Sequence, residues 1–192
     1  MAKLFAYLSA IFLLGFGSCT SSVDHSEKIG SLQSLQTELL RAEDDFGQIN
    51  FEETKAMFGR IEADLKAVQE SYEGDMSFKL AKKLSDYREV TKMVKDFPRR
   101  YARIKSEIER TKGQLGGLER ALTAKATVDS KGNEITPEYV ERMYNQEQKV
   151  ASSLINEIDE MCAKLKSAQT RYTDMLPQVT PILDSLGINS PE

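Results

Sequence analysis

The side chains that most often carry out catalysis or bind metals are scarce in this chain. Its single histidine is His25, and its two cysteines are Cys19 and Cys162. A cysteine nucleophile needs a nearby base, and zinc or di-iron centres in helical proteins need several ligands at fixed spacings. One histidine close to the N-terminus cannot supply these arrangements. We therefore expect no metal site, and we expect Cys162, beside Met161 and Leu165, to be a small buried residue.

Other patterns that sometimes indicate an enzyme favour a structural interpretation. Adjacent acidic residues occur at three places: Asp44-Asp45, Glu52-Glu53 and Asp159-Glu160. On helices such pairs usually face water. Gly116-Gly117 lies inside a helical run, which favours close packing or local bending over a phosphate loop. The chain has no Walker loop, nucleophile elbow or dinucleotide fingerprint, so we predict no enzymatic activity and no cofactor.

The feature of the sequence that most clearly indicates a binding partner is a cationic segment. Residues 79–112 hold 12 basic and 5 acidic residues, whereas residues 24–75 hold 13 acidic and 5 basic ones. This segregation favours packing of the acidic segment beside the basic one. If Phe97, Ile104 and Ile108 face the core, five cations lie on or beside the opposite face: Lys92, Lys95, Arg99, Arg103 and Arg110. We expect these five to form an exposed stripe for an anionic head group or an acidic protein, and Arg100 to reach a neighbouring helix instead.

The N-terminal residues have the pattern of a secretory signal. Residues 4–17 are almost wholly apolar, follow Lys3 and are too few for an ordinary membrane span. The run ends in Phe16-Gly17-Ser18-Cys19, which resembles the lipobox of bacterial lipoproteins. The resemblance implies cleavage after Ser18 and attachment of fatty acyl chains such as palmitate to Cys19. Thr20 resembles the residue found in lipoproteins sorted to the outer membrane. A plain secreted protein and an uncleaved anchor are the alternatives.

The rest of the chain has the periodicity of packed long helices. Between Leu32 and Tyr172, apolar residues recur at alternating spacings of three and four, and no strand-type alternation competes. The composition agrees, with 29% charged residues, 8% aromatic residues and no Trp. We predict an all-α fold, an elongated antiparallel helical bundle with coiled-coil-like seams. Glu147 is the one acid on a seam position, either near a helix end with its carboxylate reaching water or in a polar pocket.

Turn and capping residues place the helix boundaries. The predicted helices cover residues 28–47, 51–73, 76–126 and 137–176, with a short helix after them. Pro98 is predicted to kink the third helix, and residues 128–135 are predicted to form a small hairpin or an exposed turn. Asn50 and Glu53 form a capping box after a break in the seam. We expect the chain to turn back there, although one kinked arm over residues 28–73 is the alternative.

These observations together predict the domain organisation and the class of function. Residues 1–18 form the lipoprotein signal peptide, 19–27 the lipidated cysteine and polar tether, 28–186 the helical bundle and 187–192 a disordered tail. The predicted function is that of a membrane-anchored envelope lipoprotein, a non-enzymatic interaction or structural protein of the outer membrane that faces the periplasm. We expect a protein partner, no nucleic acid and no metal. The alternative is a periplasmic carrier or sensor that binds a lipid or peptide within the bundle.

Overall fold

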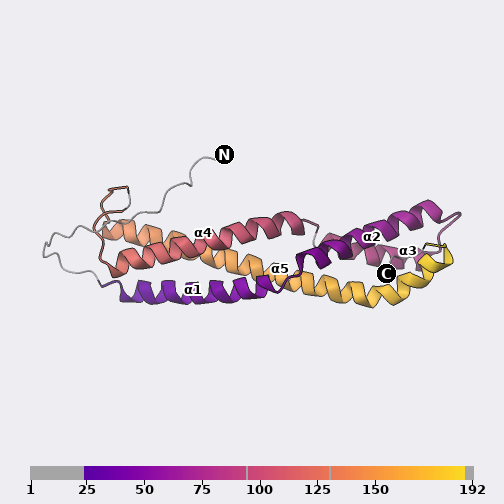
Figure 1. The fold of residues 1–192 in the computed structure, drawn as a ribbon, viewed down its shortest axis with the longest axis horizontal. Coiled ribbons are helices and arrows are strands. Elements are labelled where there is room, and N and C mark those ends of the chain that lie inside the picture. The colour runs from indigo at the N-terminus through magenta and orange to yellow at the C-terminus, as the bar shows by residue number, and fades with distance from the viewer. Residues whose placement is uncertain (1–23, 94, 130, 189–192) are drawn as a thin grey trace. The chain divides into compact units, whose positions relative to one another are not determined.

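The computed structural model describes residues 24–93, 95–129 and 131–188, and these are folded into α-helices (Figure 1). The helices are α1 (Ser26–Gly47), α2 (Phe51–Ser71), α3 (Phe78–Met93), α4 (Phe97–Thr123) and α5 (Pro137–Ser185). The described residues contain no strand beyond an isolated antiparallel bridge between Val128 and Glu134. The predicted all-α helical bundle is therefore confirmed. No helix in this part of the chain is long and apolar enough to cross a membrane.

The helices belong to two compact units. Of the described residues, those within 24–40 and 108–154 form unit 1, and those within 41–107 and 155–188 form unit 2. The helices α1, α4 and α5 each contribute one part to unit 1 and another to unit 2. Each unit is thus built from two separate stretches of sequence.

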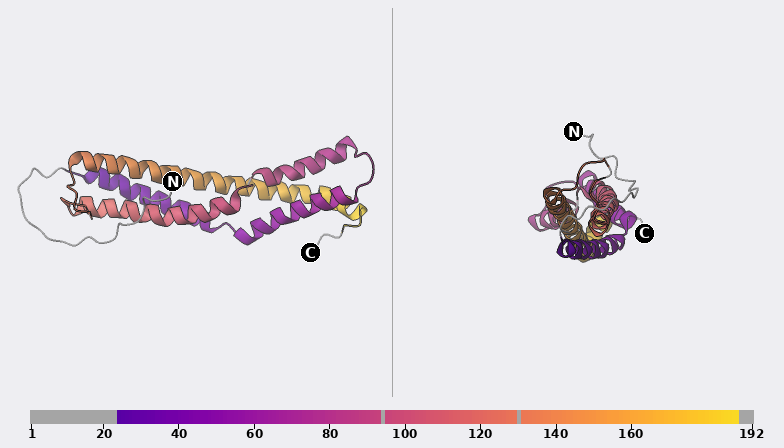
Figure 2. Two further views of the ribbon diagram at one scale, coloured as in Figure 1. Left: turned by 90° about the horizontal axis from the view of Figure 1, so that it is seen from above. Right: turned by 90° about the vertical axis from the view of Figure 1, so that its left-hand side faces the viewer.

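Unit 1 is a three-helix arrangement of the first part of α1, the second part of α4 and the first part of α5, which lie side by side (Figure 2). Lys28 pairs with Glu141 at 3.0 Å and the Tyr144 hydroxyl donates to Ser31 at 2.8 Å, so α1 and α5 run in the same direction. The connection between α4 and α5 contains the predicted hairpin. Asp129 accepts hydrogen bonds there from the backbone N–H groups of Lys131 and Asn133.

The core of unit 1 is formed by the predicted seam. Leu32, Leu39, Leu115 and Ala151 are all fully buried. Full burial of each leucine contributes roughly 1.5–3 kcal/mol to the free energy of folding. The three-four periodicity therefore identified the packing face of these helices correctly.

Unit 2 contains an antiparallel hairpin of α2 and α3 that packs on the second part of α5. Gly74 has a φ of +94° in the turn, a backbone conformation that glycine adopts without strain. Tyr87 of α3 stacks on Tyr172 of α5, whereas Phe97, ten residues later, lies near Met161. The segment from α3 to α4 therefore runs opposite to α5, and α2 runs parallel to α5.

The break between α1 and α2 does not reverse the chain. Asn50 caps α2 by accepting a hydrogen bond from the Glu53 N–H at 3.1 Å, so the predicted helix boundary is confirmed. The predicted turn-back is wrong. Phe46 and Phe51 both pack on Tyr101, at 4.6 and 4.9 Å between ring centroids, and Phe51 also packs on Phe97. The aromatic rings on both sides of the break thus follow α4 in one direction.

The predicted kinked helix over residues 76–126 is two helices. The first, α3, ends at Met93, and α4 begins at Phe97. Pro98 is therefore the second residue of α4, where its missing N–H group needs no partner within the helix. The Arg100 N–H donates to the Asp96 carbonyl at 3.0 Å and closes the first turn. Pro98 marks a helix start rather than a kink.

The last predicted boundary is also wrong, because α5 continues through Pro177 and Pro181 to Ser185. A proline inside a helix removes one backbone hydrogen bond and usually costs about 3 kcal/mol. Both prolines are on the exposed face, whereas Val179 and Leu183 are 1% and 2% exposed. The buried face thus continues past the prolines, and its apolar contacts offset their cost.

Candidate functional site

Unit 2 contains an open groove of about 800 Å³ between α2 and α5. Eight of the residues that line it recur at three-four spacings on the two helices. On α2 and its cap they are Asn50, Glu53, Met57 and Arg60. On α5 they are Cys162, Leu165, Gln169 and Tyr172. This spacing places each set on one side of its helix, so the groove follows the helix axes.

The groove has an apolar floor and a polar rim. Met57 and Leu165 are buried at its base, with 7% and 3% of their surface exposed. The polar side chains of Glu53, Lys166 and Gln169 are exposed along its edges. Such a combination is typical of surfaces that bind an apolar group and orient it through a few polar contacts.

Two cations of the groove have no carboxylate partner among the described residues. The Nε atom of Arg60 is buried and makes no hydrogen bond, and Lys166 makes no ion pair there. By contrast, Asp45 in the same groove is paired with Arg41 at 2.8 Å. A buried N–H group without an acceptor is unfavourable by roughly 1–3 kcal/mol. The charged side chains of the lining are thus two acids, Asp45 and Glu53, and two bases, Arg60 and Lys166.

A buried hydrogen bond supports the wall of the groove. The hydroxyl of Tyr87 donates to the carboxylate of Asp64 at 2.9 Å, and the Tyr87 ring stacks on Tyr172. Burial raises the pKa of Tyr87 far above its usual value, and the neighbouring Asp64 adds to this effect. Tyr87 thus stays protonated and links α2, α3 and α5 beside the groove.

The apolar periodicity of residues 51–72 predicts Phe58 and Leu65 on the buried seam together with Thr54, Ile61 and Val68, so it does not predict the burial of Met57 and Asp64. The buried positions of α2 are Thr54, Met57, Ile61, Asp64 and Val68, which also alternate by three and four. Thr54, Ile61 and Val68 are buried as predicted, whereas Met57 and Asp64 are buried in place of the more apolar Phe58 and Leu65. A buried aspartate becomes predictable only when a donor such as Tyr87 is known to face it.

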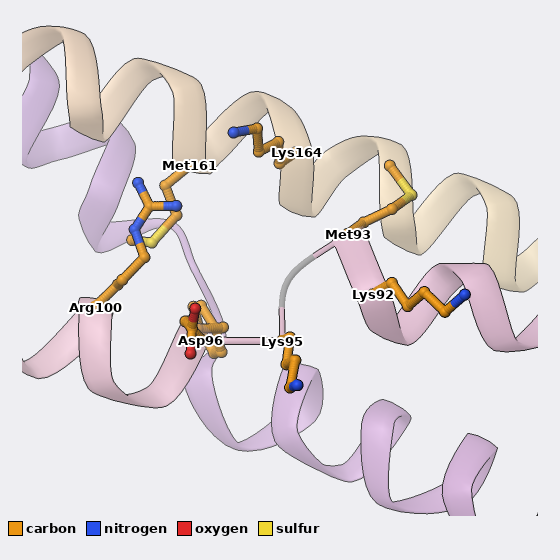
Figure 3. Close-up of a pocket in the computed structure, with 8 residues that line it drawn as sticks. Lys92, Met93, Lys95, Asp96, Arg100, Met161 and Lys164 are labelled. Atoms are coloured by element: carbon orange, nitrogen blue, oxygen red, sulfur yellow. The ribbon is translucent and has the colours of Figure 1, made fainter.

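The cationic residues predicted as one stripe are divided between different surroundings. Lys92, Lys95 and Arg100 line a small cavity of about 100 Å³ in unit 2 together with Lys164 of α5 (Figure 3). Asp96 contributes a carboxylate to the same cavity. Lys92 is paired with Glu89 at 2.5 Å, which lowers its availability to a ligand.

The remaining stripe residues also lie close to acids. Arg99 approaches Asp96 at 3.4 Å, and Arg103 forms an ion pair with Glu157 of α5. The expectation that Arg103 lies too far out to reach a neighbouring helix is therefore wrong, although Arg100 reaches Glu157 as predicted. Burial by itself raises the pKa of Glu157, but Arg103 and Arg100 together hold that pKa below its usual value.

The fifth stripe residue, Arg110, belongs to unit 1 and interacts electrostatically with Glu147. Glu147 is 3% exposed, so the polar pocket predicted as one alternative describes it better than a carboxylate reaching water. Burial raises the pKa of Glu147, and Arg110 opposes this only in part. The buried Oε2 of Glu147 has no hydrogen-bond partner within unit 1, nor do Thr111 Oγ1 and Gln114 Oε1 of α4.

The structure describes only one of the two cysteines. Cys19, the predicted lipidation site, lies outside the described residues. Cys162 is half-buried in the wall of the groove, and burial raises the pKa of its thiol. Within the described ranges, no three histidine, cysteine or acidic residues are grouped so that they could hold a metal ion.

Comparison with protein-family models, with curated proteins and with solved structures found no match to this chain. The candidate site is therefore defined by its own geometry. It consists of the groove between α2 and α5, its apolar floor and its two cations without partners.

Proposed function

We propose that this protein is a lipid-anchored, non-enzymatic interaction protein of the cell envelope. The observation that carries the interaction role is the groove between α2 and α5, with a volume of about 800 Å³. The support for the anchor is the apolar N-terminal run that ends in Gly17-Ser18-Cys19. Acyl chains on Cys19 hold the protein at the outer membrane, where it faces the periplasm, and the helical bundle binds a protein partner.

The shape and lining of the groove favour a protein segment as the ligand. The lining residues on α2 and its cap extend from Asn50 to Arg60, which is about 15 Å along a helix. The rim holds charges of both signs, which a peptide can match with side chains of its own. The groove thus suits an extended amphipathic surface.

The carrier function is the second candidate, because ligand pockets commonly have volumes of about 300–1,000 Å³. A lipid tail in this groove would lie against the guanidinium of Arg60 and the ammonium of Lys166. It would offer neither cation an acceptor, so the burial of charge would oppose binding. A bare acyl chain therefore fits this groove less well than a ligand that also carries an anionic group.

Crosslinking in living cells tests this proposal. A photoreactive amino acid replaces Gln169 in the groove or, as a control, Glu62, which is exposed on α2 outside the groove. We expect a protein crosslink from position 169 and not from position 62. A crosslink to lipid alone would favour the carrier, and equal crosslinking at both positions would contradict a groove-specific partner.

The anchor has a separate test. In cells, Cys19→Ala should move the protein from the membrane fraction to the soluble envelope fraction and abolish incorporation of labelled fatty acid. If the wild-type chain incorporates no fatty acid, the lipoprotein part of the proposal is wrong.

A further inference from the structure

We propose that Glu147, Thr111 and Gln114 form a proton-dependent clasp between α4 and α5 in unit 1. The clasp closes when the Glu147 carboxyl group takes up a proton and loosens when it releases that proton. This inference concerns unit 1 alone and does not depend on the groove of unit 2. The proton comes from solvent and returns to it, so this pH-sensitive switch needs no other reactant.

The three residues of the clasp bring buried oxygen atoms together between two helices. Thr111 and Gln114 are one turn apart on α4, so their side chains point to the same side of that helix. Arg110, next to Thr111, lies close enough to Glu147 of α5 to act on its charge. Thr111 and Glu147 are 0% and 3% exposed. Their oxygen atoms and that of Gln114 are thus enclosed at one level of unit 1.

The oxygen atoms of the clasp lack one hydrogen. Thr111 Oγ1, Gln114 Oε1 and Glu147 Oε2 are buried without a hydrogen-bond partner within unit 1. An ionised carboxylate and an amide oxygen only accept hydrogen bonds, whereas the Thr111 hydroxyl supplies one hydrogen. Two hydrogens are needed to join three oxygens. A proton on Glu147 is the second: the carboxyl O–H donates to Gln114 Oε1, and the Thr111 hydroxyl donates to the carboxyl group.

The surroundings of Glu147 favour the same neutral form. Burial raises the pKa of Glu147, and Arg110 of α4 opposes this only in part. The third helix of unit 1 adds no buried charge, because the charged side chains of α1 within 26–40 are exposed or, as with Lys28, paired with Glu141. The clasp is therefore closed at acid pH and loosens as pH rises through the pKa of Glu147 in the folded state.

The clasp lies in a part of α4 that contains several glycines. Gly113 precedes Gln114 directly, and Gly117 follows it within one turn. A Cβ atom added to either glycine would meet no neighbouring atom within 4 Å, so close packing does not require glycine there. Glycine inside a helix lowers the stability of that helix relative to alanine. Release of the proton thus removes a contact where the helical form of α4 is least stable.

Two measurements on the purified full chain test this inference. Carbon NMR of the glutamate carboxyl groups gives the pKa of each one, and the signal of Glu147 is identified by its absence in Glu147→Gln. Hydrogen exchange, corrected for the intrinsic effect of pH on exchange, reports the opening of residues 108–123 of α4 between about pH 4 and pH 8. The exchange of α3, which belongs to unit 2, is the internal reference.

Four results are expected together. The Glu147 carboxyl group titrates above its ordinary pKa of 4.5, and the α4 segment opens about tenfold more often at the upper end of this pH range than at the lower end. Glu147→Gln removes this pH dependence, because its amide group donates a hydrogen bond at every pH. The control Glu109→Gln, at an acid of α4 that is 71% exposed, retains it. Gly113→Ala reduces the opening about threefold.

A further variant gives the direction of the hydrogen bond within the clasp. Gln114→Met keeps the volume of the side chain but removes the acceptor of the carboxyl proton, so it should lower the pKa of Glu147. A rise of that pKa would overturn the inference, because it would show that the Gln114 amide group donates to an ionised carboxylate.

Two other results would also overturn the inference. They are titration of Glu147 at or below its ordinary pKa, and opening of the α4 segment that does not change with pH. Neither result concerns the groove, so the crosslinking test of the proposed function remains separate.

Discussion

Both units bury a carboxyl group among their helices, but the two carboxyl groups differ in their hydrogen bonds. In unit 2 the carboxylate of Asp64 accepts a hydrogen bond from Tyr87 at 2.9 Å. In unit 1 one carboxyl oxygen of Glu147 is buried without any hydrogen-bond partner, and burial raises its pKa. The hydrogen bond in unit 2 joins particular residues of α2 and α3. The carboxyl group in unit 1 instead makes stability depend on pH.

The largest effects should come from the apolar layers, which are common to both units. Ile61→Ala in unit 2 and Leu115→Ala in unit 1 remove fully buried side chains. Each should lower the free energy of unfolding by about 2–5 kcal/mol, the usual range for such changes. Denaturation by urea, followed by circular dichroism, measures this. A loss below about 0.5 kcal/mol in either variant would show that its layer is not a core.

Removal of one hydroxyl group should reveal the buried hydrogen bond of unit 2. Tyr87→Phe leaves the carboxylate of Asp64 without its donor and should cost about 1–3 kcal/mol. The matched control is Tyr139→Phe, because the Tyr139 hydroxyl is only partly buried and its 3.3 Å contact with Asp129 is longer. The same urea titrations apply, and equal losses in the two variants would contradict the special role of Tyr87.

Neutralisation of the buried Glu147 of unit 1 should raise the free energy of unfolding, whereas the substitutions above should lower it. The folded pKa of Glu147 is raised above the unfolded value of about 4.5, so the folded state binds the proton more tightly. Stability therefore falls as pH rises from about 4.5 through the folded pKa, and the loss remains at neutral pH. Glu147→Gln should stabilise the protein at pH 7 by about 1 kcal/mol.

The pH profile provides the control for this prediction. Unfolding curves at several pH values give the free energy of unfolding as a function of pH. In Glu147→Gln, the fall of this free energy above pH 4.5 that Glu147 causes should be absent. Its advantage over the natural chain should shrink toward acid pH. An advantage that is independent of pH would point to a packing effect and not to the ionisation of Glu147.

The smallest effect should come from the exposed ion pairs, which belong to neither buried layer. Arg99 is 81% exposed in its contact with Asp96. Arg99→Ala should change the free energy of unfolding by less than about 0.5 kcal/mol, because water and salt screen such pairs. Thermal melts at low and high salt measure this, and a loss above 1 kcal/mol would mean that Arg99 has a structural role.

The sequence predicted the helices better than their boundaries. Long three-four patterns identified the buried faces of Leu32, Leu115 and Ile158, because a buried stripe must repeat with the helical period. The pattern could not show that Pro98 begins a helix, since Phe97 and Tyr101 keep the same phase on both sides of it. Nor could it show that α5 passes Pro177, because that depends on tertiary burial of Val179.

The groove was beyond the reach of sequence reasoning for a different reason. Its lining comes from residues more than a hundred positions apart, such as Asn50 and Cys162. Between the buried Thr54 and Ile61 of α2, only the tertiary packing decides that Met57 rather than Phe58 is buried. The cationic segment was visible in the sequence, but the acids that pair with it, such as Glu157 of α5, become known only from the packing.

The division of α5 between the two units has a consequence for the order of folding events during synthesis. Residues 137–154 complete unit 1 and residues 155–185 complete unit 2, so neither unit has all its helices until nearly the whole chain has emerged. Until then, α1 lacks the helices that pack against it, because they follow about a hundred residues later in the chain. Contacts between residues so far apart in the sequence form slowly. A chain with this connectivity therefore completes both of its units only late in synthesis.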